Sequence, residues 1–183
     1  MTHRGQLGLS GALVLSCWAA RATLDGTMWL QMLVQAPILV VAGVLAARDV
    51  PPARSWLRAW NAHGIAGLTL AAGGVMLWMI PRLLDAAVEH PSVDALKYAT
   101  LVASGAIGAV SWRAAGVVVR VFLFGNATWM TATIGLLLLD SASRLCANYT
   151  MNDQQYAGYG LLVVTLTAVI FALVRGTTTV ASQ

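Results

Sequence analysis

Long apolar runs alternate with short polar and charged segments along the whole chain. The runs contain roughly 16 to 24 residues, which approaches or reaches the ~20 that a helix needs to cross a ~30 Å hydrocarbon core. They predict six membrane-spanning helices, at residues 6–22, 27–47, 62–80, 96–112, 115–139 and 156–174. The predicted fold class is therefore all-α, a polytopic transmembrane helical bundle in which residues 1–183 form a single domain.

Two of these predicted helices have unusual ends. The first follows a basic start and precedes small residues, as in a secretory signal peptide, but we interpret it as a retained membrane helix. The fourth is short unless it extends back through Lys97, whose long side chain can reach the headgroups. Before it, a short surface helix is predicted to end at His90 and Pro91. Its apolar residues repeat at helical spacing: Leu83, Leu84, Ala87 and Val88.

Composition supports insertion into a membrane and argues against other classes of protein. Apolar residues make up 58% of the chain and charged residues only 10%, so nearly all of it is expected to lie in or near lipid. The excess of basic residues is then explained by membrane sidedness rather than by binding of nucleic acid. We expect membrane lipid as a partner and no nucleic acid.

The distribution of charge predicts the orientation of the helices. If both termini are cytoplasmic, seven basic residues lie inside: Arg4, Arg48, Arg54, Arg58, Arg113, Arg120 and Arg175. Four lie outside: Arg21, Arg82, Lys97 and Arg144. The excess on the inside favours this orientation. The same topology places most acidic residues outside, which predicts an acidic outer surface: Asp25, Asp85, Glu89, Asp94, Asp140 and Asp153.

Histidines and carboxylates in the middle of a span often form the functional sites of membrane proteins, but this sequence gives little evidence for such a site. Three histidines occur, His3, His63 and His90, and on this topology they cannot form a buried pair of haem ligands. No carboxylate lies in the middle of a predicted span, which disfavours an ion or proton pathway. A small unrelated transporter is kept only as a further alternative.

Four methionines suggest a copper site as an alternative to a metal-free protein. They lie at the outer ends of the second and third predicted helices: Met28, Met32, Met76 and Met79. Soft thioethers bind Cu(I), and Cys146 or His90 could add a ligand. Methionine is also an ordinary gap-filler in apolar helices, so we favour a protein without metal or other cofactor.

Several polar side chains are better explained by contacts between helices. Gln31 and Gln35 share one face of the second predicted helix beside Pro37; they line a site or, as we favour, bond to neighbouring helices. In "MNDQQYAGYG", Asp153 is expected to cap the last helix. Either of two glutamines is expected to bond to a neighbouring span or loop: Gln154 or Gln155. Two glycines are expected to admit another helix at close range: Gly158 and Gly160.

The stretch "DQQYAGYGLL" resembles the "DQQ-x-AG" signature of the CtaG family, multispanning membrane proteins associated with assembly of the copper centre of cytochrome c oxidases. Other segments are similar in order and spacing: "MLVQAPILVVAG", "MLWMIPRLLDAAVEHPSVDAL", "SGAIGAVSW" and "RVFLF", which begins at Arg120. The likeness covers residues 25–165. It implies a helical membrane protein that works with an oxidase.

The chain departs from this family at the positions of its histidines. Where the family has two histidines four residues apart, this chain has Asp25 and Trp29, and a later loop has Asp94, Lys97 and Tyr98 in place of a histidine and a Glu-His pair. The resemblance thus implies a scaffold that no longer binds copper. We expect a non-enzymatic accessory or assembly subunit of a heme-copper oxidase or related respiratory complex, in a bacterial inner membrane. A membrane copper-handling chaperone is the alternative.

Overall fold

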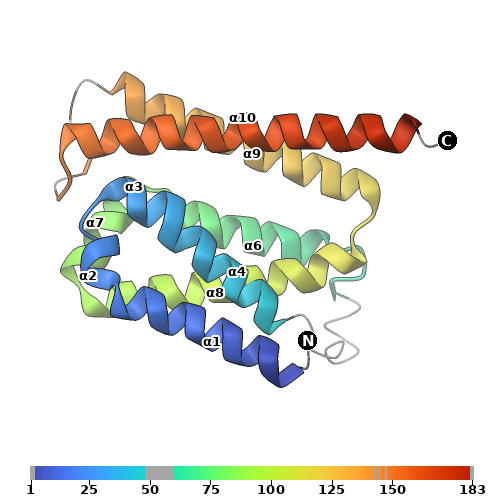
Figure 1. Cartoon of the computed structure of the whole chain (residues 1–183), viewed down its shortest axis with the longest axis horizontal. Coiled ribbons are helices and arrows are strands. Elements are labelled where there is room, and N and C mark those ends of the chain that lie inside the picture. The colour runs from blue at the N-terminus through green and yellow to red at the C-terminus, as the bar shows by residue number, and fades with distance from the viewer. Residues whose placement is uncertain (1–2, 48–59, 142, 144, 147, 182–183) are drawn as a thin grey trace.

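The structure, a computed structural model, describes residues 3–47, 60–141, 143, 145–146 and 148–181 (Figure 1). Its described residues form helices and no strand. In chain order the helices are α1 (His3–Ala19), α2 (Arg21–Leu24), α3 (Met28–Leu30), the π-helix η1 (Gln31–Gln35), α4 (Ala36–Ala46), α6 (Ile65–Leu77), α7 (Pro81–Glu89), α8 (Pro91–Ala114), α9 (Val117–Asp140) and α10 (Met151–Ala181). The all-α fold class is confirmed.

Among the described residues, four stretches are long and apolar enough to cross a membrane by length and composition, where the sequence predicts six. They are Met28–Ala46, which runs through α3, η1 and α4, then Pro91–Ala114, Val117–Asp140 and Met151–Val174. The third predicted span contains α6, and α7 is the short helix predicted to end at His90. These two helices are bent by 69°, and counting the pair as one span gives five. The first predicted span overlaps the apolar helix Gly5–Ala19, which is shorter than a full crossing.

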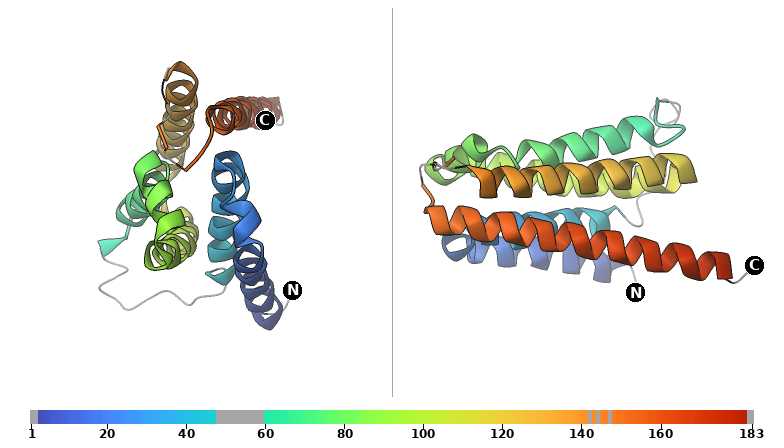
Figure 2. Two further views of the ribbon diagram at one scale, coloured as in Figure 1. Left: turned by 90° about the vertical axis from the view of Figure 1, so that its left-hand side faces the viewer. Right: turned by 90° about the horizontal axis from the view of Figure 1, so that it is seen from above.

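The helices form two layers, which can be followed in both views of Figure 2. One layer contains α1, α4 and α10, and the other contains α8, α6 and α9. Glycines allow α4 and α8 to meet closely between the layers, because a Cβ on Gly43 would overlap the backbone of Val102 and one on Gly105 would overlap that of Val40. Close backbone approach of this kind is how helices associate in lipid.

The two ends of the bundle differ in structure. At one end α1 begins and α10 ends (Figure 1). At the other end lie the α2–α3 connection, α7 and the α9–α10 connection. We call this second end the polar end, because buried polar side chains from these segments meet there.

The π-helix η1 lies directly before Pro37, inside the predicted helix 27–47. Pro37 has no N–H with which to continue the α-helical pattern, and its ring crowds the carbonyl one turn earlier. A wider turn relieves this crowding, and the N–H of Ala36 donates to the carbonyl of Gln31, five residues back. Gln31 and Gln35, the first and last residues of η1, are both buried.

Candidate functional site

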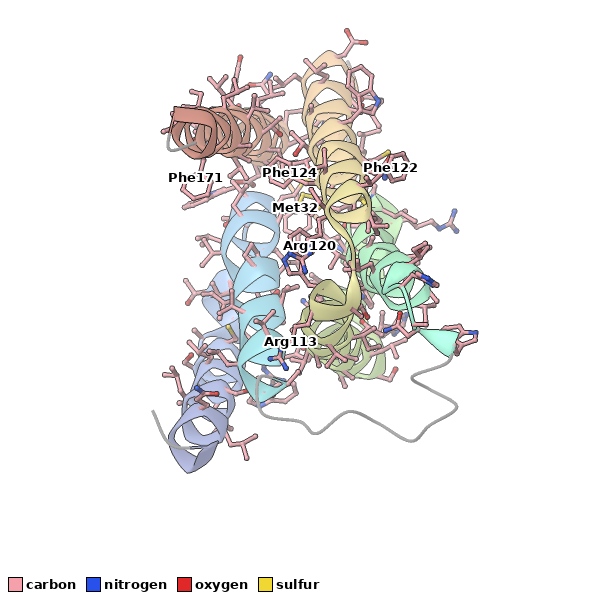
Figure 3. The ribbon with its side chains drawn as sticks, turned by 90° about the vertical axis from the view of Figure 1, so that its right-hand side faces the viewer. Met32, Arg113, Arg120, Phe122, Phe124 and Phe171 are labelled. Atoms are coloured by element: carbon pink, nitrogen blue, oxygen red, sulfur yellow. The ribbon has the colours of Figure 1, made fainter. Side chains whose placement is uncertain are left out.

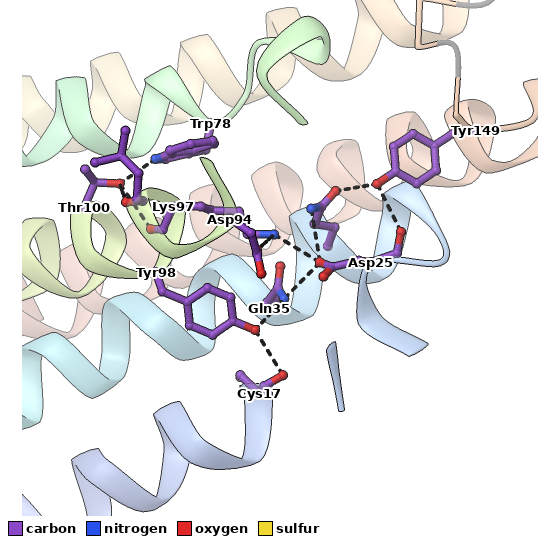
Figure 4. Close-up of polar contacts among 11 residues, drawn as sticks. Cys17, Asp25, Gln35, Trp78, Asp94, Lys97, Tyr98, Thr100 and Tyr149 are labelled. Carbon is purple, nitrogen blue, oxygen red and sulfur yellow. Dashed lines mark hydrogen bonds and ion pairs between the residues drawn. The ribbon is translucent and has the colours of Figure 1, made fainter. Parts of the chain in front are cut away.

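A buried polar cluster lies at the polar end, where side chains from four parts of the chain meet (Figure 4). Asp25 comes from the connection after α2, and Gln31 and Gln35 come from η1. The other members come from the first turns of α8 and from the α9–α10 connection: Asp94, Lys97, Tyr98 and Tyr149. We refer to these seven residues as the polar cluster.

Lys97 is the centre of the polar cluster. Its Nζ lies 3.0 Å from Oδ1 of Asp25 and 3.0 Å from Oδ1 of Asp94, and only 2% of its side chain is exposed. The two acids are also largely buried, with 16% and 7% of their side chains exposed. A buried ammonium is tolerated only when it is paired. The expectation that Lys97 reaches the headgroups was therefore wrong, because two carboxylates hold its ammonium inside the protein.

Each carboxylate has a second source of stabilisation besides Lys97. Asp94 lies in the first turn of α8, where the partial positive charge of the helix N-terminus favours an acid. Asp25 Oδ1 accepts hydrogen bonds from the amides of Gln31, at 3.2 Å, and Gln35, at 3.1 Å. The two glutamines thus bind a carboxylate from another segment, which explains why both face the same way.

Two tyrosines extend the polar cluster to neighbouring segments. Gln35 donates to the hydroxyl of Tyr98 at 3.0 Å, and that hydroxyl donates to the Cys17 carbonyl of α1 at 3.0 Å. The hydroxyl of Tyr149 lies 2.7 Å from Oε1 of Gln31 and 3.1 Å from the Asp25 carbonyl. Burial raises the pKa of Tyr149 above its ordinary value, and the charge of Asp25 acts in the same direction. Tyr149 is therefore a neutral donor at physiological pH.

The polar cluster has very little free space. The cavity beside Gln31, Gln35 and Lys97 has a volume of about 10 Å³, which is about the least that can hold one water molecule. Oε1 of Gln35 is buried there and has no hydrogen-bond partner among the described residues. Within the described part of the chain, no group of three or more His, Cys, Asp or Glu residues could hold a metal ion. The geometry is that of a closed ion-pair network rather than of a substrate pocket.

Most of the methionines singled out in the sequence lie next to this network in one apolar cluster. Met28 and Met32 are fully buried there, Cys146 packs with them, and Met79 lies at the edge. Met76 is half-buried and is not part of this cluster. Burial raises the pKa of the Cys146 thiol to about 12, with a smaller contribution from Asp85. The thiol is therefore protonated at physiological pH.

The junction before α10 is held by Thr150 and Gln154. Thr150 is the N-cap residue, because its hydroxyl accepts from the Asp153 N–H at 3.2 Å, while the Asp153 carboxylate accepts from the Thr150 N–H at 3.3 Å. Asp153 thus closes a reciprocal capping box instead of being the cap itself. Gln154 is buried, donates to the Leu138 carbonyl and accepts from the Leu145 N–H, both at 2.9 Å. Gln155 is exposed.

The remaining candidates lie away from the polar cluster. A Cβ on Gly158 would lie 2.8 Å from Cγ of Leu139, so α9 and α10 meet closely there. Arg120 donates from Nε to the Trp112 carbonyl at 3.1 Å and joins the ends of α8 and α9. His90, which precedes α8, is exposed, and Trp29 is 36% exposed. None of these is a member of the polar cluster.

Sequence reasoning singled out the two glutamines, and the family resemblance singled out four more members of the polar cluster, Asp25, Asp94, Lys97 and Tyr98. Neither predicted that these residues meet in one place. Asp94 and Lys97 are three residues apart on a helix, which is a visible signal for an ion pair. Asp25 is 72 residues from Lys97, and no local pattern connects them. Tyr149 is 118 residues from Gln31, and its role likewise depends on the packing of the helices.

Residues 26–178 match the family described as "Protein of unknown function (DUF1404)", and because the match covers most of the chain, the protein belongs to this family. The matched region begins immediately after Asp25 and includes every other member of the polar cluster. Comparison with curated proteins and with solved structures gives no match.

Proposed function

We propose that this member of the DUF1404 family is a non-catalytic accessory or assembly subunit of a heme-copper oxidase or of a related respiratory membrane complex. Its location is the bacterial inner membrane, and it acts by binding other membrane subunits. It needs no metal of its own.

The observation that carries this proposal is the position of the Lys97 ammonium. By the resemblance to the CtaG family, two of its histidines fall at Asp25 and Trp29, and a histidine and a Glu-His pair fall at Asp94, Lys97 and Tyr98. Four of these five residues, all except Trp29, lie in the polar cluster. An internal cation, bonded to two carboxylates, stands where a metal-binding group would be expected. A scaffold that keeps its shape with a lysine in place of a metal fits a structural role.

The polar end offers a surface for such a partner. On the orientation that the basic residues predict, this end faces outward and both termini are cytoplasmic. Exposed or partly exposed acids surround it, among them Asp85, Glu89 and Asp153. The side chain of Asn148 donates to Oε1 of Glu89 at 3.2 Å, which links the α9–α10 connection to α7. An acidic outer face favours a partner with basic residues at the same membrane surface.

Gentle purification from the native membrane tests this proposal. We expect subunits of a respiratory complex to co-purify in a fixed ratio, and deletion of the gene to lower the amount of assembled oxidase measured by its haem spectrum. Complementation with the double variant Asp85→Asn, Glu89→Gln should restore less oxidase than the wild-type protein does. Normal oxidase levels in the deletion strain, with no co-purifying respiratory subunit, would contradict the proposal.

A copper-handling chaperone is the second candidate, and one observation favours it. Met28, Met32, Met79 and Cys146, all soft ligands for Cu(I), lie in or beside the same apolar cluster. Stoichiometric Cu(I) bound under reducing conditions, and lost in a Met28→Leu, Met32→Leu variant, would support the chaperone. Met76→Leu is the matched control, because Met76 lies outside the cluster. Our first proposal expects no specific copper in any of these proteins.

A further inference from the structure

A polar side chain is exposed near the middle of α9, where the surrounding medium is hydrocarbon. Asn126 is the tenth residue of Val117–Asp140, which places it about 14 Å along a helix with a rise of 1.5 Å per residue. A span of this length covers the ~30 Å hydrocarbon core, so Asn126 lies far from both headgroup layers. Its side chain is exposed and has no hydrogen-bond partner among the described residues.

Asn126 belongs to a face of α9 that points away from the rest of the bundle. Figure 3 shows Phe122, one turn before it, on the outer side of α9, whereas Phe124 points toward the space between α9, α10 and α4. Phe122 and Trp129 are 70% and 72% exposed. We refer to the exposed residues at helical spacing along this side as the outer α9 face: Phe122, Gly125, Asn126, Trp129, Thr133 and Leu136.

Lipid satisfies the apolar residues of the outer α9 face but not the amide. A polar group without a hydrogen bond in an apolar medium is costly, and in membranes side chains such as asparagine bond across helix interfaces. Thr133 has no such need, since its hydroxyl donates to the Trp129 carbonyl at 2.9 Å. Asn126 is therefore a residue of this face that requires a partner from outside the described chain.

The shape of the outer α9 face permits a second helix to approach. A Cβ on Gly125 would meet nothing within 4 Å, so this glycine leaves a notch directly beside Asn126. Small residues of this kind let two helix backbones come close.

From these observations we propose that the outer α9 face binds the same face of a second copy of this chain, with the two Asn126 amides bonded to each other. Two copies inserted in the same orientation have α9 at the same depth. A two-fold axis along the membrane normal therefore places Asn126 of one copy against Asn126 of the other. An amide supplies both donors and an acceptor and is therefore self-complementary, as a two-fold interface requires. This inference does not depend on the oxidase partner.

Dilution in lipid measures this association. The full chain, labelled separately with donor and acceptor dyes, is placed in vesicles at increasing lipid-to-protein ratios, and energy transfer reports the dimer. Asn126→Leu should weaken the association constant by roughly 3- to 30-fold, and Asn126→Gln, which keeps an amide, should weaken it less. The control is Thr128→Val, since the Thr128 hydroxyl is already bonded to the Phe124 carbonyl at 2.7 Å.

Folding and partner identity are checked in parallel. Asn126→Leu should melt at the same temperature as the wild-type monomer, because the exposed Asn126 side chain makes no hydrogen bond within the described chain that the change removes. Energy transfer that is absent at all dilutions, or that is equal for wild-type protein and Asn126→Leu, would overturn the proposal. So would cross-linking from position 126 in native membranes to a polypeptide other than this one.

Discussion

The buried charge of Lys97 requires partners from several segments at the polar end. Its ammonium contacts Asp25 and Asp94, and Asp25 in turn accepts bonds from two glutamines. Such a network is not a large net source of stability, because removing charges from water costs nearly as much as pairing them returns. Its members are nevertheless interdependent, because loss of one partner leaves the others buried and unpaired.

Replacing Lys97 by methionine should therefore destabilise the protein strongly. The change leaves two buried carboxylates without a cation, and we expect a loss of about 3 to 5 kcal/mol of unfolding free energy, measured by thermal unfolding in detergent. The matched control is the triple variant Asp25→Asn, Asp94→Asn, Lys97→Met, which has no buried charge at this site. It should recover most of the lost stability. A single variant as stable as wild type would show that Lys97 is not a buried ion-paired group.

Cys146 allows a test that depends on pH. Because burial raises its pKa to about 12, only about one thiol in ten thousand is ionised at pH 8, against a substantial fraction for a free thiol of pKa ≈ 8.5. In a Cys17→Ser background, maleimide labelling of folded protein at pH 8 should be far slower than labelling of an added cysteine at exposed position 148. Unfolding should remove the difference. Equal rates in the folded protein would contradict the buried position of Cys146.

The raised pKa of Cys146 also makes the stability of the protein depend on pH. The unfolded thiol ionises near pH 8.5, whereas the folded one stays neutral up to about pH 12. The unfolded state therefore gains free energy by ionisation as the pH rises between these values, and the folded state does not. Stability contributed by the neutral buried thiol is fully present below pH 8.5 and is lost above it.

At the scale of helices, the length of an apolar run predicted some elements well and others poorly. α10 contains its predicted span, and α9 covers all but the first two residues of its own, because both apolar runs are long. The run at 62–80 is equally apolar, yet the chain bends after Leu77, and Nε1 of the buried Trp78 donates to Thr100 at 2.6 Å. The bend falls where the sequence predicts that the span ends and a separate short helix follows, and α7 is that helix. The π-helix η1 was not predicted, because the apolar run 27–47 was interpreted as one regular helix through Pro37.

Packing of α9 against α10 can be tested at Gly158. A side chain added there meets Leu139 and the Gly135 carbonyl, so Gly158→Leu should cost at least about 1 to 3 kcal/mol, the usual range for overpacking. Gly73→Leu is the control, because a Cβ at Gly73 meets nothing within 4 Å. Thermal unfolding should separate the two variants clearly. Equal melting temperatures would mean that α9 and α10 are farther apart than the structure places them.

The whole molecule has two different ends: the polar end, and the end where α1 begins and α10 ends. The two ends are predicted to face opposite sides of the membrane. The structure places the start of α1, the α8–α9 turn and the end of α10 toward the same end (Figure 1). The distribution of basic residues assigns that end to the cytoplasm. Only the distribution of charge predicts which side of the membrane each end faces. The orientation therefore requires its own measurement.

Cysteine labelling of intact cells provides that measurement. In a background with Cys17 and Cys146 changed to serine, single cysteines replace Glu89 and Asn148 at the polar end and Gly116 in the α8–α9 turn; all three positions are exposed. A membrane-impermeant maleimide should label positions 89 and 148 from outside and position 116 only after the cells are broken. Seven inner basic residues against four outer ones favour this result. Labelling of position 116 in intact cells, with 89 and 148 protected, would reverse the topology and place the acidic face in the cytoplasm, where no outer-surface partner could reach it.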